Sequence, residues 1–159
     1  LRRKPHNALL ENGPPSGCNK CTNPGCRMCK NHLCETKNIT SYSNKLTYNV
    51  RGKITCKTSN VVYLVTCRKC GLQYVGETGL PLADRINCHL SCIRRKLRTP
   101  VGIHFNLPGH SHLDLEVVGV ERFLPLKTAD HRKTKEITWQ NLLVTCHPFG
   151  INRLKETSR

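Results

Sequence analysis

The sequence predicts an α+β protein with a small antiparallel sheet flanked by helices, and a Cys-rich, zinc-stapled extension before it. A β-branched and aromatic hairpin pattern occupies residues 61–78, and two segments after it have helical periodicity. Cys-x-x-Cys pairs crowd residues 18–34. A chain of 159 residues is expected to form one domain and to bury roughly two thirds of its unfolded surface.

The first 17 residues, LRRKPHNALLENGPPSG, are basic and end in Pro-Pro-Ser-Gly, which is typical of a linker. Because the chain begins at Leu1 and its only methionine is Met28, we expect a piece of a longer protein. We divide the chain into a basic tail, a Cys-rich extension, a main domain and a polar end, at residues 1–17, 18–56, 57–153 and 154–159.

The extension begins with CNKCTNPGCRMCKNHLC, which holds five cysteines and few core-forming side chains. Such a segment cannot bury a core of its own, so we expect a metal to hold it. Weak alternation in the stretch 39–56, which includes LTYNVRGKITC, predicts two short strands.

The main domain opens with VVYLVTC, RKCG and LQYVGET, which predict a strand, a turn and a second strand. We expect Thr78 to cap the helix LPLADRINCHLSCIRRKL, with Pro81 in its first turn. Its apolar side chains recur at helical spacing at Ile86, Leu90, Ile93 and Leu97.

The rest of the domain continues as a short helix or loop, a strand and a helix. These are PVGIHFNLPGH, LDLEVVGVERF and TADHRKTKEITWQNLLVTC, the last capped by Thr128. The expected apolar stripe of the last helix is Trp139, Leu142, Leu143 and Cys146. The order β-β-α-(α)-β-α favours an antiparallel sheet packed against helices.

A formal net charge of +16 predicts a polyanionic partner, for which nucleic acid is the first candidate. No apolar run of eighteen residues and no basic interfacial helix are present, so we expect no membrane partner. Two basic clusters are expected to grip a DNA backbone without reading its sequence. They are Arg94, Arg95, Lys96 and Arg98, and then Lys127, Arg132, Lys133 and Lys135.

Eleven cysteines beside eight histidines favour zinc in a reducing compartment over disulfides. Cys67 and Cys70 form half of a tetrahedral site, for which His104, His110 and His112 are the nearest further ligands. The second expected set is Cys18, Cys21, Cys26 and Cys29, in which Cys34, His32 or Cys56 can replace one member. An iron–sulfur cluster is less favoured, since nothing else indicates redox chemistry. Small buried hydrophobes are expected at Cys88, Cys92 and Cys146.

Over residues 59–153, the order VVY, YVGET, Arg85-x-x-x-His89, a distant glutamate and Asn152 resembles a GIY-YIG nuclease domain. In particular it is similar to the endonuclease domain of Penelope-like retroelements, through CRKC between the tyrosines, HFNLPGH and HPFGIN. The first motif lacks the glycine of GIY, and YVG replaces YIG. The resemblance implies catalytic roles for Tyr63, Tyr74, Arg85, His89, Glu136 and Asn152, with one metal ion sufficing. It favours His104 and His110 as the zinc ligands.

These residue types suit phosphodiester hydrolysis. Tyr63 or Tyr74 can activate water if a nearby cation draws off the phenol proton, whose pKa is ordinarily about 10. Arg85 can clamp the phosphate, and His89 lies one helical turn later. Glu136 is the expected ligand of Mg²⁺ or Mn²⁺.

Glu116 and Glu121 are alternative carboxylates in the predicted third strand. Glu136 is preferred because Trp139 and Leu143 follow it at helical spacing, and because it matches the family position.

The expected function is a nuclear, metal-dependent DNA endonuclease that lies C-terminal to a reverse transcriptase. By resemblance it would nick a genomic target, and the released 3′-hydroxyl would prime copying of a template RNA. One alternative is a non-catalytic zinc-dependent nucleic-acid-binding module whose tyrosines stack on bases. Another is a zinc-stapled protein adaptor. The sequence leaves open which tyrosine is the base, whether one strand or both are cut, and the oligomeric state.

Overall fold

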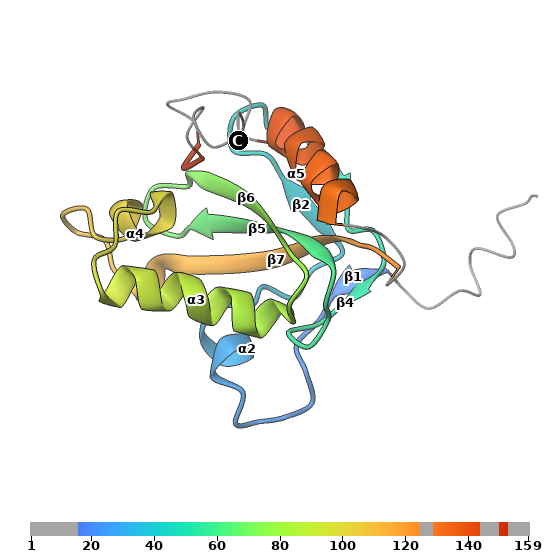
Figure 1. Cartoon of the computed structure of the whole chain (residues 1–159), viewed down its shortest axis with the longest axis horizontal. Coiled ribbons are helices and arrows are strands. Elements are labelled where there is room, and N and C mark those ends of the chain that lie inside the picture. The colour runs from blue at the N-terminus through green and yellow to red at the C-terminus, as the bar shows by residue number, and fades with distance from the viewer. Residues whose placement is uncertain (1–15, 125–128, 144–149, 153–159) are drawn as a thin grey trace, which may run out of the picture.

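The centre of the molecule is a three-stranded antiparallel sheet with the strand order β6-β5-β7. Its strands are β5 (Val61–Cys67), β6 (Gln73–Thr78) and β7 (Leu115–Arg122). The structure is a computed structural model that describes residues 16–124, 129–143 and 150–152. Helices and smaller strand pairs surround the sheet, so the predicted α+β class is confirmed (Figure 1).

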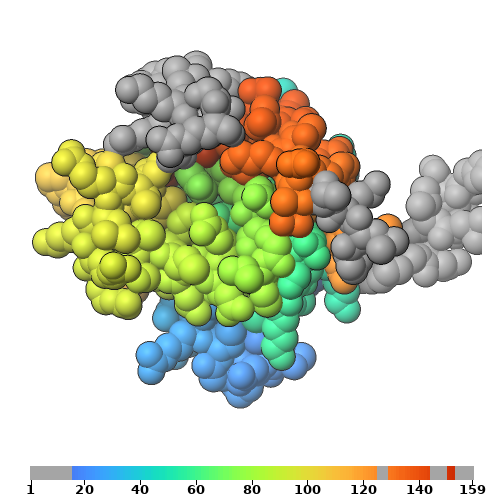
Figure 2. Space-filling model, viewed as in Figure 1, coloured from blue at the N-terminus to red at the C-terminus, as the bar shows by residue number. Residues whose placement is uncertain are grey.

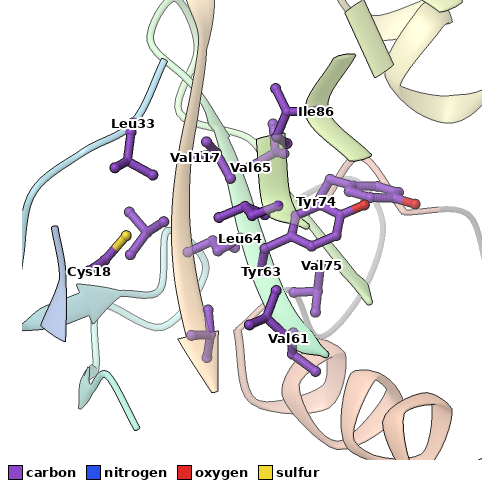
Figure 3. Packing of buried hydrophobic residues seen from close by; sticks show 14 of the residues in the cluster. Cys18, Leu33, Val61, Tyr63, Leu64, Val65, Tyr74, Val75, Ile86 and Val117 are labelled. Atoms are coloured by element: carbon purple, nitrogen blue, oxygen red, sulfur yellow. The ribbon is translucent and has the colours of Figure 1, made fainter. Parts of the chain in front are cut away.

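The central strand β5 is buried on both faces, because the sheet is covered on both sides. Every residue of VVYLVTC except Thr66 is buried, so the strand reads as a continuous apolar run rather than an alternation. Figure 3 shows Ile86 on the side of Tyr63 and Val65, while Cys18 and Leu33 lie on the opposite side. The register against β7 shifts between Val62 and Tyr63, because Val120 of β7 is an extra residue that forms a β-bulge opposite this point of β5.

The Cys-rich extension covers the second face of the sheet. It contains β1 (Gly17–Cys18), α2 (Arg27–Asn31), β2 (Asn38–Thr40), β3 (Thr47–Asn49) and β4 (Lys53–Ile54). Strand β1 pairs in parallel with β4, and β2 pairs antiparallel with β3. The segment joins the sheet through bridges from Leu33 to Val117 and from Arg51 to Glu121. Strands β3 and β4 are the two expected in LTYNVRGKITC, and β2 is additional.

Helix α3 (Leu82–Arg94) packs on the Tyr63 face of the sheet and places Leu82, Ile86 and Ile93 in the core. The prediction that Thr78 caps this helix is wrong. Pro81 occupies the N-cap position, while the Thr78 hydroxyl bonds to the backbone of Leu80 within the connecting turn. The first helical amides instead donate to backbone carbonyls of residues 56 and 58. The start of α3 is therefore held by the segment that joins the extension to the main domain.

The segment after α3 forms α4 (Pro100–His104) and a 3-10 turn, η1 (His112–Asp114). The Thr99 side chain caps α4 by accepting a hydrogen bond from the Gly102 amide at 3.1 Å. Proline in the first turn of this short helix has no amide to leave unpaired. This arrangement brings His104 and His110 toward the hairpin turn of the sheet.

Helix α5 (Ala129–Leu143) packs against β6 and β5. Trp139 and Leu143 are buried as predicted, but Leu142 is exposed because it points away from the packed side. Thr128 and Cys146 lie outside the described residues. Within the described ranges, no helix has both the length and the apolar character needed to cross a bilayer.

Candidate active site and metal centres

A chain of buried hydrogen bonds joins helix α3 to strand β5. The Tyr63 hydroxyl lies 2.6 Å from His89 Nε2, and Arg85 Nε lies 3.2 Å from the same hydroxyl oxygen. Arg85 and His89 are one helical turn apart, so both side chains reach Tyr63 from the same face of α3. These three predicted residues therefore form one connected unit.

The direction of each proton in this unit follows from its chemistry. The guanidinium of Arg85 can only donate, so the Tyr63 oxygen accepts from it and its O–H donates to His89 Nε2. Burial, and then the positive charge of Arg85, lower the pKa of His89 to about 3. The imidazole is therefore neutral at pH 7 and can accept a hydrogen bond from the Tyr63 hydroxyl.

Burial also raises the pKa of Tyr63 above its ordinary value, and the neighbouring Tyr74 hydroxyl adds to this effect. Arg85 opposes the shift, while the charge of Glu136 raises it slightly further. The Tyr63 side chain is 0 % exposed. It therefore stays a neutral phenol that fixes the positions of Arg85 and His89.

The glycine of the YVG segment explains how the Tyr63 ring fits against β6. Gly76 is paired with Tyr63 across the sheet. A Cβ atom added at Gly76 would lie only 2.4 Å from the Tyr63 hydroxyl oxygen. Only glycine permits this close approach of the ring to the backbone, so the third motif residue serves the first tyrosine.

A cavity of about 180 Å³ opens beside this unit. Tyr74, Arg85 and His89 line it, together with Cys88 and Cys92 of α3 and residues 99–101 before and in α4. Figure 3 shows the hydroxyl ends of Tyr63 and Tyr74 pointing the same way. Of the two tyrosines, Tyr74 is the one that lines the cavity.

The expectation that Cys88 and Cys92 are buried hydrophobes is wrong. Cys88 is exposed and Cys92 is half-buried, because both lie on the side of α3 that faces the cavity rather than the sheet. Cys146 falls outside the described residues.

Glu136 lies on the core side of α5, as its spacing from Trp139 predicts. Its side chain is buried, and its two oxygens accept from Lys133 Nζ at 3.2 Å and Gln140 Nε2 at 3.0 Å. Burial raises the pKa of the carboxyl group above its ordinary value, while Lys133 opposes this and Glu77 adds to it. The site is thus a poorly compensated buried carboxylate with a second acid nearby.

The two alternative glutamates are occupied elsewhere. Glu121 accepts from Trp139 Nε1 at 2.8 Å and faces both Arg51 and Lys135, while Glu116 lies 3.6 Å from Arg68. Both therefore serve packing and surface charge pairing.

Asn152 uses its side-chain amide on the edge of the sheet. Its Oδ1 accepts from the Val75 amide at 2.7 Å, and its Nδ2 donates to the Val75 carbonyl at 3.0 Å. These two hydrogen bonds satisfy the backbone groups of Val75 at the outer edge of β6, next to Tyr74. Any positioning by Asn152 acts through the strand.

Cys67, Cys70, His104 and His110 come together at the hairpin turn, with their ligand atoms all within 4.8 Å of one another. Cys70 Sγ lies 3.4 Å from His104 Nε2, close to the roughly 3.5 Å expected for two ligands of one tetrahedral zinc ion. Gly71 follows with φ of +82°, a conformation that the tight turn requires.

His110 supports a metal at this position. Its Nδ1 can only donate to the Pro108 carbonyl, 3.1 Å away, which leaves a lone pair on Nε2. Among the described residues, that Nε2 is the buried side-chain atom that has no hydrogen-bond partner. A zinc ion would satisfy it.

The second group consists of Cys21, Cys26, Cys29 and Cys56, again with all ligand atoms within 4.8 Å. The sulfurs of Cys21 and Cys29 are 3.7 Å apart, and those of Cys26 and Cys56 are 3.9 Å apart. Two sulfurs on one tetrahedral zinc would be about 3.8 Å apart. This donor set therefore fits zinc, or another metal that prefers thiolates.

The predicted membership of this second group needs one correction, because Cys18 is not in it. Cys18 belongs to β1, is fully buried, and accepts a hydrogen bond from the Gly119 amide through its sulfur at 3.3 Å. Cys56, one of the three replacements considered, takes its place. Of the other two, His32 donates to the Leu115 carbonyl, and Cys34 packs against the core.

The proposed DNA-binding residues fall into two classes. Arg94, Arg95, Lys96 and Arg98 at the end of α3 are exposed, and no ion pair involves them within the described ranges. By contrast, Lys133 and Lys135 face Glu136 and Glu121, and Arg132 lies 2.9 Å from Glu77. Lys127 lies outside the described residues. Of the two predicted clusters, the one at the end of α3 is thus the one whose described positive charges have no carboxylate partner.

Glu77 was not singled out from the sequence, although it belongs to the YVGET segment. It lies opposite Val62 and holds Arg132 of α5 beside the first strand, where Arg132 also donates to Asn60. The available signal was the one charged residue of the strand sequence QYVGET.

No family model, curated protein or solved structure matches this chain.

Proposed function

We propose that this chain is a metal-dependent DNA endonuclease domain of the GIY-YIG type, as in Penelope-like retroelements. The observation that carries the proposal is the hydrogen-bonded chain Arg85–Tyr63–His89, which borders a cavity also lined by Tyr74. Burying a phenol, an imidazole and a guanidinium together is costly unless they serve each other or a reaction.

Each residue has a role that its environment suits. Arg85 donates a hydrogen bond from Nε to the Tyr63 hydroxyl oxygen. Its terminal nitrogens can therefore bind a phosphate at the cavity. Neutral His89 accepts the hydrogen bond from the Tyr63 hydroxyl, and Tyr74 lines the cavity, where a water would attack. Of the two tyrosines, Tyr74 is therefore the better candidate for direct contact with the reacting group.

Glu136 would hold the divalent ion. A raised carboxyl pKa means that the ionised form lacks compensation, and Mg²⁺ or Mn²⁺ would supply it. Such ions keep several waters and need only one or two carboxylates, so Glu136, with Glu77 nearby, is a sufficient protein contribution. When bound, the ion would stabilise the negative charge that develops on the phosphate.

The two cysteine groups would bind zinc and act as clamps. The Cys67 group ties the turn of the β5–β6 hairpin to α4, and the Cys56 group ties the extension to the start of α3. The hairpin and α3 carry the proposed catalytic side chains, so zinc would stabilise the fold around the site without taking part in the reaction.

In its full-length context, the domain would follow a reverse transcriptase and act in the nucleus on double-stranded DNA. The nick would release a 3′-hydroxyl that primes copying of the template RNA. The net charge of +16 is consistent with binding of both the DNA target and the template RNA.

A non-catalytic module whose tyrosines stack on bases fits the geometry less well. Tyr63 and Tyr74 are 0 % and 8 % exposed, so neither ring face is available to a base.

The test is relaxation of supercoiled plasmid with Mg²⁺ or Mn²⁺ by the wild type, Glu136→Gln and Tyr74→Phe. We expect nicking by the wild type and a loss of at least about a hundredfold in both variants. Glu116→Gln is the matched control and should nick normally. Equal DNA binding with no nicking by any of the proteins would instead support a binding module, and absence of salt-dependent DNA binding would leave a protein adaptor.

A further inference from the structure

A second groove, separate from the proposed active site, lies between α2 and α3. Its volume is about 550 Å³, within the range of roughly 300–1,000 Å³ that is usual for ligand clefts. In Figures 1 and 2 the blue α2 region lies against the yellow-green α3. Nothing in the zinc clamps or the proposed catalytic unit uses this groove.

The lining combines an apolar floor with cationic and amide groups. Leu90 and Ile93 of α3 contribute apolar surface, Arg27 and Arg94 contribute positive charge, and Asn31 and Asn87 contribute amides. No acidic side chain lines it among the described residues. An apolar floor suits the flat face of a base, amides suit its polar edge, and arginines suit phosphates.

His32 adds an acceptor in a defined orientation. Its Nδ1 lies 2.8 Å from the Leu115 carbonyl, which can only accept, so Nδ1 carries the proton and Nε2 keeps a lone pair. Burial lowers the pKa of this histidine, so the ring is neutral near pH 7. A buried, fixed acceptor among amides can receive a hydrogen bond from the exocyclic amine of a base.

The groove and the proposed catalytic cavity share helix α3. Asn87, Leu90 and Arg94 recur at helical spacing on the groove side, whereas Arg85 and His89 line the cavity on another side. A strand held in the groove would therefore be held one helix width from the phosphate at Arg85.

We propose that this groove binds unpaired nucleotides of single-stranded DNA beside the duplex that the domain cuts. The proposal deepens the proposed nuclease function and rests on its nucleic-acid binding. It predicts that the preferred substrate is a duplex with an adjoining single-stranded segment, rather than a blunt duplex. Charge complementarity and the base-sized apolar floor favour this occupant over a second copy of the chain, which is itself strongly positive.

The test is fluorescence anisotropy at one fixed salt concentration, on the Glu136→Gln background so that no strand is cut. Two labelled ligands are compared, a blunt duplex and the same duplex with a ten-nucleotide single-stranded overhang. We expect the overhang to improve affinity about tenfold, since stacking is worth about 1–3 kcal/mol per base. Asn87→Trp, which fills the groove from an exposed position, should remove this gain and leave blunt-duplex affinity within about twofold.

Two matched controls separate the groove from general charge and bulk. Asn141→Trp adds the same bulk on an exposed site of α5, and Lys30→Ala removes one charge from α2 outside the groove lining. Asn141→Trp should keep the overhang gain, and Lys30→Ala should weaken both ligands alike, whereas Arg27→Ala should reduce the gain itself.

Equal affinity for the two ligands, or identical behaviour of Asn87→Trp and Asn141→Trp, would overturn the groove proposal. A change of oligomeric state in Asn87→Trp alone, measured by sedimentation, would also overturn it by identifying a second copy as the occupant. The nuclease proposal is judged separately by plasmid nicking. If the protein binds the overhang ligand more tightly but never nicks plasmid, the groove proposal stands and the nuclease proposal is rejected.

Discussion

The turn of the β5–β6 hairpin and its middle satisfy their buried polar groups in different ways. At the turn, four possible ligand atoms lie within 4.8 Å of one another, and His110 Nε2 has no hydrogen-bond partner among the described residues. In the middle, Tyr63, His89 and Arg85 satisfy each other through hydrogen bonds. We therefore expect the turn to depend on a bound metal for its stability, and we expect the hydrogen-bonded middle to be stable without one.

The largest expected effect is removal of zinc. Structural zinc contributes an apparent 10–16 kcal/mol in small zinc-dependent domains at pH 7. We expect a strong chelator to lower the melting temperature by more than about 10 °C, measured by circular dichroism, and added zinc to restore it. An unchanged melting temperature in protein shown by elemental analysis to be zinc-free would contradict the proposal that zinc stabilises the fold.

The next effect distinguishes Cys56 from Cys18. The wild type should hold two zinc ions per chain by elemental analysis, and Cys56→Ser should hold one. The Cys56→Ser substitution should also loosen the start of α3, because the Cys56 carbonyl accepts a hydrogen bond from the Ala83 amide. Cys18→Ser is the matched control and should keep both ions, losing only about 1–2 kcal/mol of stability for an imperfectly placed hydroxyl. The reverse pattern would restore the spacing-based prediction.

A third effect is the pH dependence of stability due to His89. Its pKa is lowered from 6.5 to about 3 in the folded state, so between these values the unfolded chain binds the extra proton. The contribution of His89 is present above pH 6.5 and is lost as the pH falls. Between pH 7.5 and 4.5 the loss is about 2–3 kcal/mol.

This loss is measured by urea unfolding. His89→Gln should flatten the stability curve by that amount relative to the wild type, whereas the exposed control His112→Gln should follow the wild type. Loss of zinc at low pH affects all three proteins, so the difference between the curves isolates His89. Parallel curves for His89→Gln and the wild type would argue against a buried neutral imidazole.

The smallest effect concerns Gly76. An alanine there would meet the Tyr63 ring, so the ring must shift and its bonds to His89 and Arg85 must lengthen. We expect a cost of about 1–3 kcal/mol and a larger fractional loss of nicking than of stability. Gly79→Ala, which meets only the flexible end of Arg132, is the control and should be milder. Equal activity in both variants would contradict the role given to Gly76.

Local patterns predicted what local physics determines. The hairpin, the third strand and the buried side chains Ile86, Ile93, Trp139 and Leu143 follow from periodicity and β-branched composition, whereas Leu97 lies beyond the end of α3 and Leu142 is exposed. The cysteines of the Cys67 group were found from their spacing in a turn, which left His104, His110 and His112 as further ligands, and the family resemblance favoured His104 and His110. Glu136 was preferred because its helical spacing from Trp139 places it against the core, and because it matches the position of the glutamate in the family that the sequence resembles.

Contacts between distant segments were beyond such patterns. Cys56 replaces Cys18 because β1 pairs with β4 and directs Cys18 into the core beneath Gly119, which no spacing rule reveals. Thr78 is a residue type that caps helices, yet the backbone carbonyls of Cys56 and Thr58 accept from the first amides of α3. Lys133 and Lys135 are basic in sequence, but their carboxylate partners are apparent only in three dimensions.

The most direct test of the central claim compares Glu136→Gln with Cys67→Ser for melting temperature and for nicking rate per folded molecule. Glu136→Gln keeps the bond from Gln140 and loses only a partly exposed ion pair with Lys133, so its melting temperature should stay within a few degrees. Its nicking should fall at least about a hundredfold. Cys67→Ser should melt well below the wild type but nick within about threefold of it per folded molecule at low temperature, as expected of a clamp. A stable Cys67→Ser protein without activity, or an active Glu136→Gln protein, would contradict the account.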